Sequence, residues 1–200
     1  RLLPTGCLQE TLAIPSLGYR GTYLAVAAAG SAMRNVRLVV AGGTSATDRY
    51  VAELTKAAGI SPDILFTGYV TGAEKAELLT NALLFVLPST VEGYPIALLE
   101  ARNHGLGCLV SDIPPHREVV RDGEDGLLFR TGDFSDFAAK LQDLVADRDR
   151  IARFGEQAKS RMAGNASWKD VARQTADVYR SVLLPRGSRG GRERSSLAER

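Results

Sequence analysis

Short apolar runs alternate with longer amphipathic stretches along most of this chain. The runs are rich in β-branched and aromatic residues, as is typical of strands covered on both faces. They occupy residues 36–41, 64–67, 84–87, 108–111 and 126–129. Because helical stretches separate them, the pattern predicts an α/β fold with a parallel, doubly wound sheet and helices on both faces.

The predicted helices carry recognisable ends. Thr71 to Glu74 has the spacing of a capping box, so a helix should run from there to Asn81. Pro95 suits the first position of a helix that Gly105 closes, and Asp133 suits the N-cap of the next one. Further helices are predicted over residues 47–58, 134–145, 151–162 and 167–183.

The stretch from Pro88 to Ala101 concentrates the chemistry of the chain. It runs from the end of a predicted strand into the helix that Pro95 opens, where the free N–H groups of Ile96 and Ala97 would form an anion site. Glu92 precedes the helix and Glu100 lies within it. Because the helix is apolar on nearly every side, Glu100 is predicted to be buried and to need a partner, for which a sugar hydroxyl would serve.

Composition narrows the function classes. A net charge of +2 gives no reason to expect a nucleic-acid partner. Cys7 and Cys108 are too few for a disulfide framework, so reduced thiols and a cytoplasmic location are expected. The histidines, His104 and His116, have no Cys or His cluster beside them, so no metal site is expected. His116 could lie near a sugar pocket, although a loop or capping role is the stronger expectation.

The chain divides into three parts by pattern. Residues 1–19 show no clean period and are expected to be irregular, residues 20–184 form the α/β domain, and residues 185–200 form a disordered basic tail. The tail suits either solvation or a peripheral contact with anionic lipid at the inner face of a membrane, and solvation is the stronger expectation. Because the sequence begins without Met, we expect it to be an excised fragment.

The motif P-S-x-x-E-G-Y-P-x-x-L-L-E-A, with its Glu-x7-Glu spacing, resembles the signature of one large enzyme family. This is glycosyltransferase family 4 (group 1), the retaining nucleotide-sugar glycosyltransferases with the two-domain GT-B fold. Phe66-Thr-Gly-Tyr-Val70 and Gly105 to Pro114 occur in the matching order, followed by Arg117-Glu-Val-Val and Asp122-Gly-Glu-Asp-Gly-Leu-Leu. The resemblance covers residues 35–183 and implies the C-terminal, Rossmann-like half of that fold.

The resemblance implies a role for each candidate residue. Glu92 would be catalytic, holding the donor sugar hydroxyls and supporting the transition state, and Glu100 would bind the ribose. The remaining implied donor-binding residues are Arg20, Gly42, Gly43, Tyr69, Val70, Gly93, Tyr94, Pro95, Ile96 and Ala97. The alternatives are a solvated charge for Arg20, a plain turn for Gly42 and Gly43, an apolar covering contact for Tyr69 and Val70, and a helix-capping role for Glu92.

The implied reaction moves a hexosyl group from a nucleoside diphosphate to an acceptor hydroxyl with retention, without a metal or another cofactor. The donor would be a UDP-, GDP- or ADP-linked sugar; the sequence chooses neither sugar, base nor acceptor. An N-terminal domain outside this chain would hold the acceptor, so the fragment alone should be inactive. The alternatives are a nucleotide-sugar-binding module without catalysis, and another GT-B enzyme such as a nucleotide-sugar epimerase.

Overall fold

A computed structural model describes residues 11–15, 37–42, 64–164 and 168–183 of the chain. The predicted helix over 47–58, the candidate residues Arg20 and Gly43 and the predicted tail lie outside these ranges. The chain divides into two compact units, residues 1–163 and 164–200. The sequence interpretation placed this boundary later, at residue 184.

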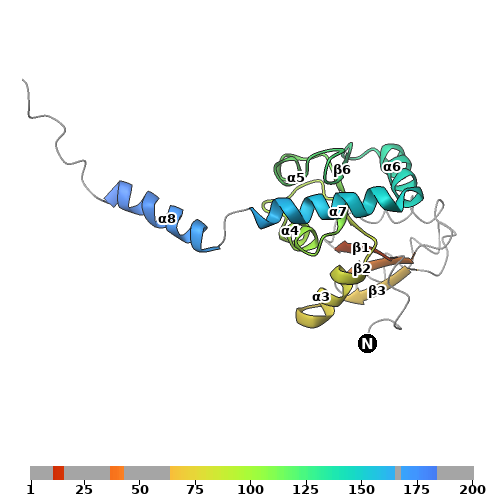
Figure 1. Ribbon diagram of the computed structural model, residues 1–200, viewed down its shortest axis with the longest axis horizontal. Coiled ribbons are helices and arrows are strands. Elements are labelled where there is room, and N and C mark those ends of the chain that lie inside the picture. The colour runs from red at the N-terminus through yellow and green to blue at the C-terminus, as the bar shows by residue number, and fades with distance from the viewer. Residues whose placement is uncertain (1–10, 16–36, 43–63, 165–167, 184–200) are drawn as a thin grey trace, which may run out of the picture. The chain divides into compact units, whose positions relative to one another are not determined.

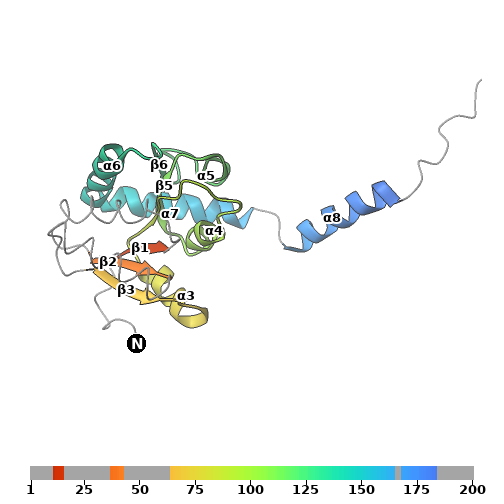
Figure 2. The ribbon, with the colours of Figure 1, turned by 180° about the vertical axis from the view of Figure 1, so that it is seen from behind.

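The first unit is built on one parallel sheet with strand order β3-β2-β1-β4-β5-β6. In both views β1, β2 and β3 lie side by side (Figures 1 and 2). The strands are β1 Thr11–Pro15, β2 Arg37–Ala41, β3 Ile64–Gly68, β4 Leu84–Leu87, β5 Gly107–Ser111 and β6 Leu127–Phe129. The five predicted strands are confirmed, each within one residue at either end.

Strand β1 corrects the interpretation of residues 1–19 as an irregular segment. All five of its residues pair with β2 on one side, and Leu12 and Ala13 pair with β4 on the other. A central strand this short, ending in Pro15, has too little pattern to stand out in the sequence. Its place depends on partners that lie far along the chain. Because the chain builds outward from β1 first in one direction and then in the other, β1 and β4 mark the topological switch point of the sheet.

Helices cover both faces of the sheet. They are α3 Gly72–Asn81, α4 Ile96–Asn103, α5 Pro114–Val119, α6 Phe134–Ala146 and α7 Arg148–Ala163; α8 Trp168–Leu183 belongs to the second unit. One core packs Leu84 and Val86 against α6 and α7, and the other packs Phe85 and Leu87 against α4. Neighbouring residues of β4 thus point to opposite cores, which explains its unbroken apolar run. None of the described helices is long and apolar enough to cross a membrane.

The helix ends test the capping predictions. Asp133 caps α6, its side chain accepting from the Asp136 N–H at 2.9 Å. Thr71 is the N-cap of α3 but makes no side-chain capping bond, so the predicted capping box is wrong while the predicted helix is right. Gly105 has a φ of 78° and follows the C-cap of α4. Its N–H bonds Arg102 O and the next N–H bonds Ala101 O, which is the Schellman pattern.

Candidate functional site

The predicted site residues that the structure describes gather at the carboxyl edge of the sheet. Gly42 follows β2, Tyr69 and Val70 follow β3, and the loop carrying Glu92 follows β4. The β4 loop therefore leaves the sheet at its switch point, where doubly wound sheets bind their ligands.

The entry to α4 differs in one residue from the predicted anion site. Pro95 is the N-cap, with φ −81° and ψ 70°, an inverse γ-turn in which the Ile96 N–H donates to Tyr94 O at 2.9 Å. Ile96 is thus excluded as an anion donor in this conformation. The next two N–H groups, of Ala97 and Leu98, have no hydrogen-bond partner among the described residues, so they carry the positive end of the helix dipole.

The loop before α4 offers its small and aromatic residues to solvent. Gly93 is exposed, and a Cβ added there would meet no atom within 4 Å. Tyr94 is 64% exposed, whereas Pro95 is buried and fixes the end of the loop against the protein. Space thus surrounds the loop between Glu92 and the helix.

Glu92 is half-buried and held from one side. The buried Ser89 hydroxyl donates to Glu92 Oε1 at 2.7 Å. The second carboxylate oxygen has no partner within the described ranges. One oxygen is therefore oriented by the protein while the other stays open to a ligand.

Glu100 is placed differently from its prediction. Its side chain is 35% exposed rather than buried, and Lys75 Nζ of α3 donates to its Oε1 at 2.6 Å. Lys75 was missed because a contact between two helices does not show in the pattern of either; its place just after the Tyr69–Val70 loop was the available signal. The pair sets a cation beside the carboxylate proposed to bind ribose.

The predicted donor-binding residues in the loops after β2 and β3 differ in their surroundings. Gly42, at φ 98°, donates its N–H to Gly68 O at 2.6 Å and so links the two loops. The Val70 side chain packs against the core of Val39 and Leu78, so it makes the covering contact that was the alternative prediction. Tyr69 is 83% exposed and remains available to a ligand.

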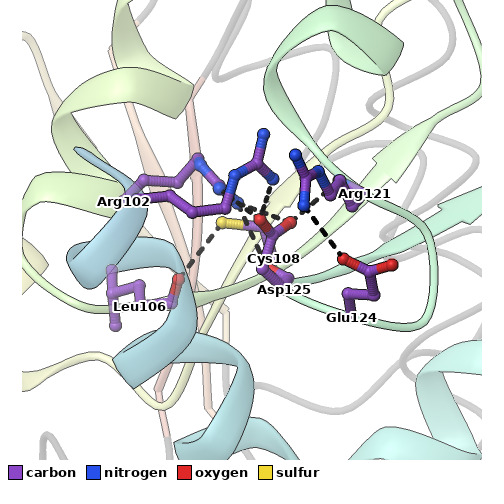
Figure 3. Close-up of polar contacts among 7 residues, drawn as sticks. Arg102, Leu106, Cys108, Arg121, Glu124 and Asp125 are labelled. Atoms are coloured by element: carbon purple, nitrogen blue, oxygen red, sulfur yellow. Dashed lines mark hydrogen bonds and ion pairs between the residues drawn. The ribbon is translucent and has the colours of Figure 1, made fainter. Parts of the chain in front are cut away.

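A buried ion pair joins Arg102 of α4 to Asp125 (Figure 3). Arg102 and Asp125 are each 1% exposed, and the guanidinium donates to both carboxylate oxygens at 2.9 and 3.2 Å. Arg161 of α7 also contacts Asp125. Burial by itself would raise the pKa of Asp125, but hydrogen bonds from Arg102 and from the Arg121 N–H lower it. Charge pairing thus ties α4 to the turn before β6 and to α7.

Cys108 lies beside this cluster, where burial raises the pKa of its thiol to about 12. Its Sγ donates to Leu106 O at 3.3 Å. The buried thiol expected from the apolar strand is confirmed.

Two cavities lined by described residues lie away from this edge. One of about 330 Å³ lies at the amino ends of β4 and β5, with Leu83, His104 and Gly107 in its lining. Another of about 440 Å³ lies beside Asp125 and Arg161. Across the described ranges, no three His, Cys, Asp or Glu side chains come close enough to hold a metal ion. The expected absence of a metal stays a prediction.

The strand order defines a doubly wound α/β domain, and domains of this kind bind ligands at the carboxyl ends of their strands, where the acidic loop lies. Residues 19–161 match the family model described as "Glycosyl transferases group 1". The chain therefore belongs to the glycosyl transferases group 1 family.

Curated relatives agree with this family. The chain is 32% identical over 174 residues to alpha-maltose-1-phosphate synthase of Mycolicibacterium smegmatis, a match covering 82% of this chain and 45% of the relative. It is 31% identical over 163 residues to D-inositol 3-phosphate glycosyltransferase of Nocardia farcinica, covering 79% of this chain and 36% of the relative. The chain thus spans less than half the length of these two relatives.

Solved structures share the fold at low sequence identity. Sucrose-phosphate synthase from Thermosynechococcus elongatus superposes with a TM-score of 0.79 at 22% identity, covering 90% of this chain and 47% of the other. Anabaena Alr3699/HepE, solved in complex with UDP and glucose, gives a TM-score of 0.77 at 16% identity, covering 90% of this chain and 53% of the other. The predicted Rossmann-like fold, as in GT-B glycosyltransferases, is confirmed.

Proposed function

We propose that this chain is the donor-binding half of a retaining glycosyltransferase. It binds a nucleoside diphosphate sugar, from which a hexosyl group passes to an acceptor hydroxyl. The observation that carries the proposal is the pair of half-buried carboxylates, Glu92 and Glu100, on either side of the α4 entry at the switch point. Each has one oxygen held by a protein side chain.

The α4 entry suits the diphosphate. The N–H groups of Ala97 and Leu98, at the positive end of a helix, have no partner in the described part of the chain, and Lys75 adds a cation on the neighbouring helix. When the bond to the sugar breaks, negative charge grows on the leaving diphosphate. Fixed N–H donors and cations stabilise that charge, which is the main electrostatic requirement of the step.

The carboxylates suit hydroxyl groups. The open oxygen of Glu92 would accept from sugar hydroxyls and support the positive charge that develops on the sugar ring. Glu100 would accept from ribose hydroxyls, with Lys75 compensating its charge so that a polyanionic nucleotide is not repelled. Exposed Tyr69 would lie against the base. Arg20 and Gly43 lie outside the described ranges; in this proposal Arg20 binds the diphosphate and Gly43 contacts the phosphate or the sugar of the donor.

The acceptor site belongs, in this proposal, to the part of the protein that the chain does not span. Relatives more than twice as long as the matched stretch support this view. UDP and glucose bound to Alr3699/HepE support a nucleotide sugar as the donor. The comparisons give no support to the epimerase alternative.

Calorimetric titration with UDP, GDP and ADP, free and as sugar conjugates, tests donor binding. Glu100→Ala should raise the Kd of the preferred nucleotide by about 10-fold or more, because a hydrogen bond from the ribose to a charged acceptor contributes roughly 1.5–3 kcal/mol to binding. Glu124→Ala is the matched control, since Glu124 is a 66% exposed glutamate paired with Arg121 away from the site. Equal affinity of E100A and E124A would contradict the ribose assignment.

The catalytic assignment needs the full-length protein. Glu92→Ala should lower kcat of sugar transfer by about 100-fold or more, as expected when a positioned transition-state contact is lost. E124A should retain the wild-type kcat. An E92A variant with normal turnover would remove Glu92 from the reaction.

A further inference from the structure

Ser89 is hydrogen-bonded both to Glu92 on the loop before α4 and to strand β5. Its hydroxyl donates to Glu92 Oε1 at 2.7 Å, and its carbonyl accepts from the Ser111 hydroxyl. Ser89 is 4% exposed and Ser111 is fully buried at the end of β5. The two serines therefore connect the carboxyl end of β5 to the carboxylate on the neighbouring loop.

His116 of α5 completes this chain of hydrogen bonds. Its Nδ1 lies 2.8 Å from Ser111 O and 3.2 Å from Ser111 Oγ. Because a carbonyl only accepts, Nδ1 carries the proton and donates to Ser111 O. The Ser111 hydroxyl has one proton and donates it to Ser89 O, because the other acceptor in reach, Leu87 O, is farther away at 3.4 Å. These contacts fix which group donates and which accepts at each hydrogen bond from His116 through Ser111 to Ser89.

The protonation state of the His116 ring follows from the same assignment of donors and acceptors. With the proton on Nδ1, Nε2 of the fully buried imidazole is an acceptor, and within the described part of the chain it has no partner. A charged ring would need an acceptor for a second N–H. Burial accordingly lowers the pKa of His116, against the opposing effects of the Ser111 carbonyl and the Glu92 charge. The imidazole remains neutral with one defined tautomer, which suits a rigid support.

We propose that Ser111 and His116 are positioning residues that orient the Glu92 carboxylate through Ser89. This inference rests on the catalytic role proposed for Glu92. His116 fixes the backbone and side chain of Ser111, and Ser111 fixes the Ser89 carbonyl. The Ser89 hydroxyl then holds one Glu92 oxygen, so that the other meets the sugar in a constant direction. Neither positioning residue needs to touch the substrate.

The test measures sugar transfer by the full-length protein. Ser111→Ala and His116→Leu, which removes the Nδ1 donor, should lower kcat by about 10- to 100-fold, the cost of a small misplacement of a reacting group. KM for the donor and the Kd for UDP should stay within about twofold of wild type, because the ribose and diphosphate contacts are retained. His116→Asn keeps an N–H donor at the Nδ1 position and should restore most of the turnover. A purely structural role would not divide kcat from KM in this way.

The Glu92→Ala background makes the test specific. If Ser111 acts through Glu92, adding S111A to E92A should change kcat no further. A normal kcat for S111A beside an impaired E92A would overturn the positioning role alone, as would a full additional loss in the double variant. If the wild-type protein binds no nucleotide, or if E92A turns over normally, the proposed function and this inference are overturned together. Should S111A lose its fold by circular dichroism, Ser89→Ala takes its place, with the same expected and contradicting values of kcat.

Discussion

Asp125→Asn removes the charge that balances Arg102 while keeping the size of the side chain. Both members of the pair are 1% exposed, so the guanidinium would remain charged and buried without its partner. Removing one partner of a buried ion pair costs about 3–5 kcal/mol, because the remaining charge is left uncompensated. Domains are stable by only about 5–15 kcal/mol in total, so this one substitution should remove a large part of the free energy of unfolding.

An exposed ion pair in the same chain supplies the matched control. Asp112 accepts from Arg117 at 2.5 and 2.9 Å, but the two side chains are 33% and 57% exposed. Exposed pairs contribute about 0.2–1 kcal/mol, so Asp112→Asn should have a small effect on the free energy of unfolding. Geometry alone would rank the two pairs as equals. Burial separates them.

Urea denaturation followed by far-UV circular dichroism measures both variants, with the slope checked for constancy. The double variant R102M/D125N adds a second comparison, because it removes both charges. It should be more stable than D125N, since no unpaired charge stays buried. A D125N midpoint equal to that of D112N would refute the reasoning, and so would a double variant less stable than D125N.

Three further measurements address other parts of the fold. Gly155→Ala should destabilise the chain by about 1–3 kcal/mol, because its Cβ would lie 2.0 Å from the Gly105 carbonyl oxygen; Gly93→Ala, with open space around it, should be nearly neutral in the same urea titration. The lowered pKa of His116 means that the unfolded chain binds more protons than the folded one below about pH 6.5. The free energy of unfolding should therefore decrease as the pH is lowered through this range, by at most about 1.4 kcal/mol per pH unit. H116N should lose that component, and identical pH profiles would contradict a buried neutral imidazole. With its pKa raised to about 12, Cys108 should resist iodoacetamide until the chain unfolds, as peptide mapping by mass spectrometry would show; rapid labelling of the folded chain would contradict its burial.

Local pattern predicted most of the fold. Residues 84–87 are apolar at every position because a parallel strand between two helical layers is buried on both faces, and the structure has a strand with the same bounds. Gly105 ended α4 as predicted, because a left-handed residue is needed there and glycine adopts that conformation at little cost. Asp133 capped α6 for an equally local reason, a hydrogen bond to an N–H three residues ahead.

The α4 helix shows what helical periodicity in the sequence can predict about burial and what it cannot. Leu98, Ala101 and Arg102 share the i, i+3, i+4 face, and all three are buried. The pattern thus held a signal that Arg102 faces the core, which the apolar surroundings of Glu100 obscured. Glu100 lies off that face and is partly exposed beside Lys75. The sequence could suggest that Arg102 is buried, but only the fold supplies Asp125 as its partner.

By itself, the sequence determined the strand and helix pattern of residues 64–163 and the family signature around Glu92, and it predicted a ligand edge at the carboxyl ends of the strands. Tertiary structure alone decided that Thr11–Pro15 is the central strand, that Lys75 meets Glu100, and that His116 reaches Glu92 through two serines. The physical reason is the range of the interactions. Burial periodicity and caps act within one or two turns, whereas strand pairing and side-chain hydrogen bonds join segments that only the folded sheet brings together.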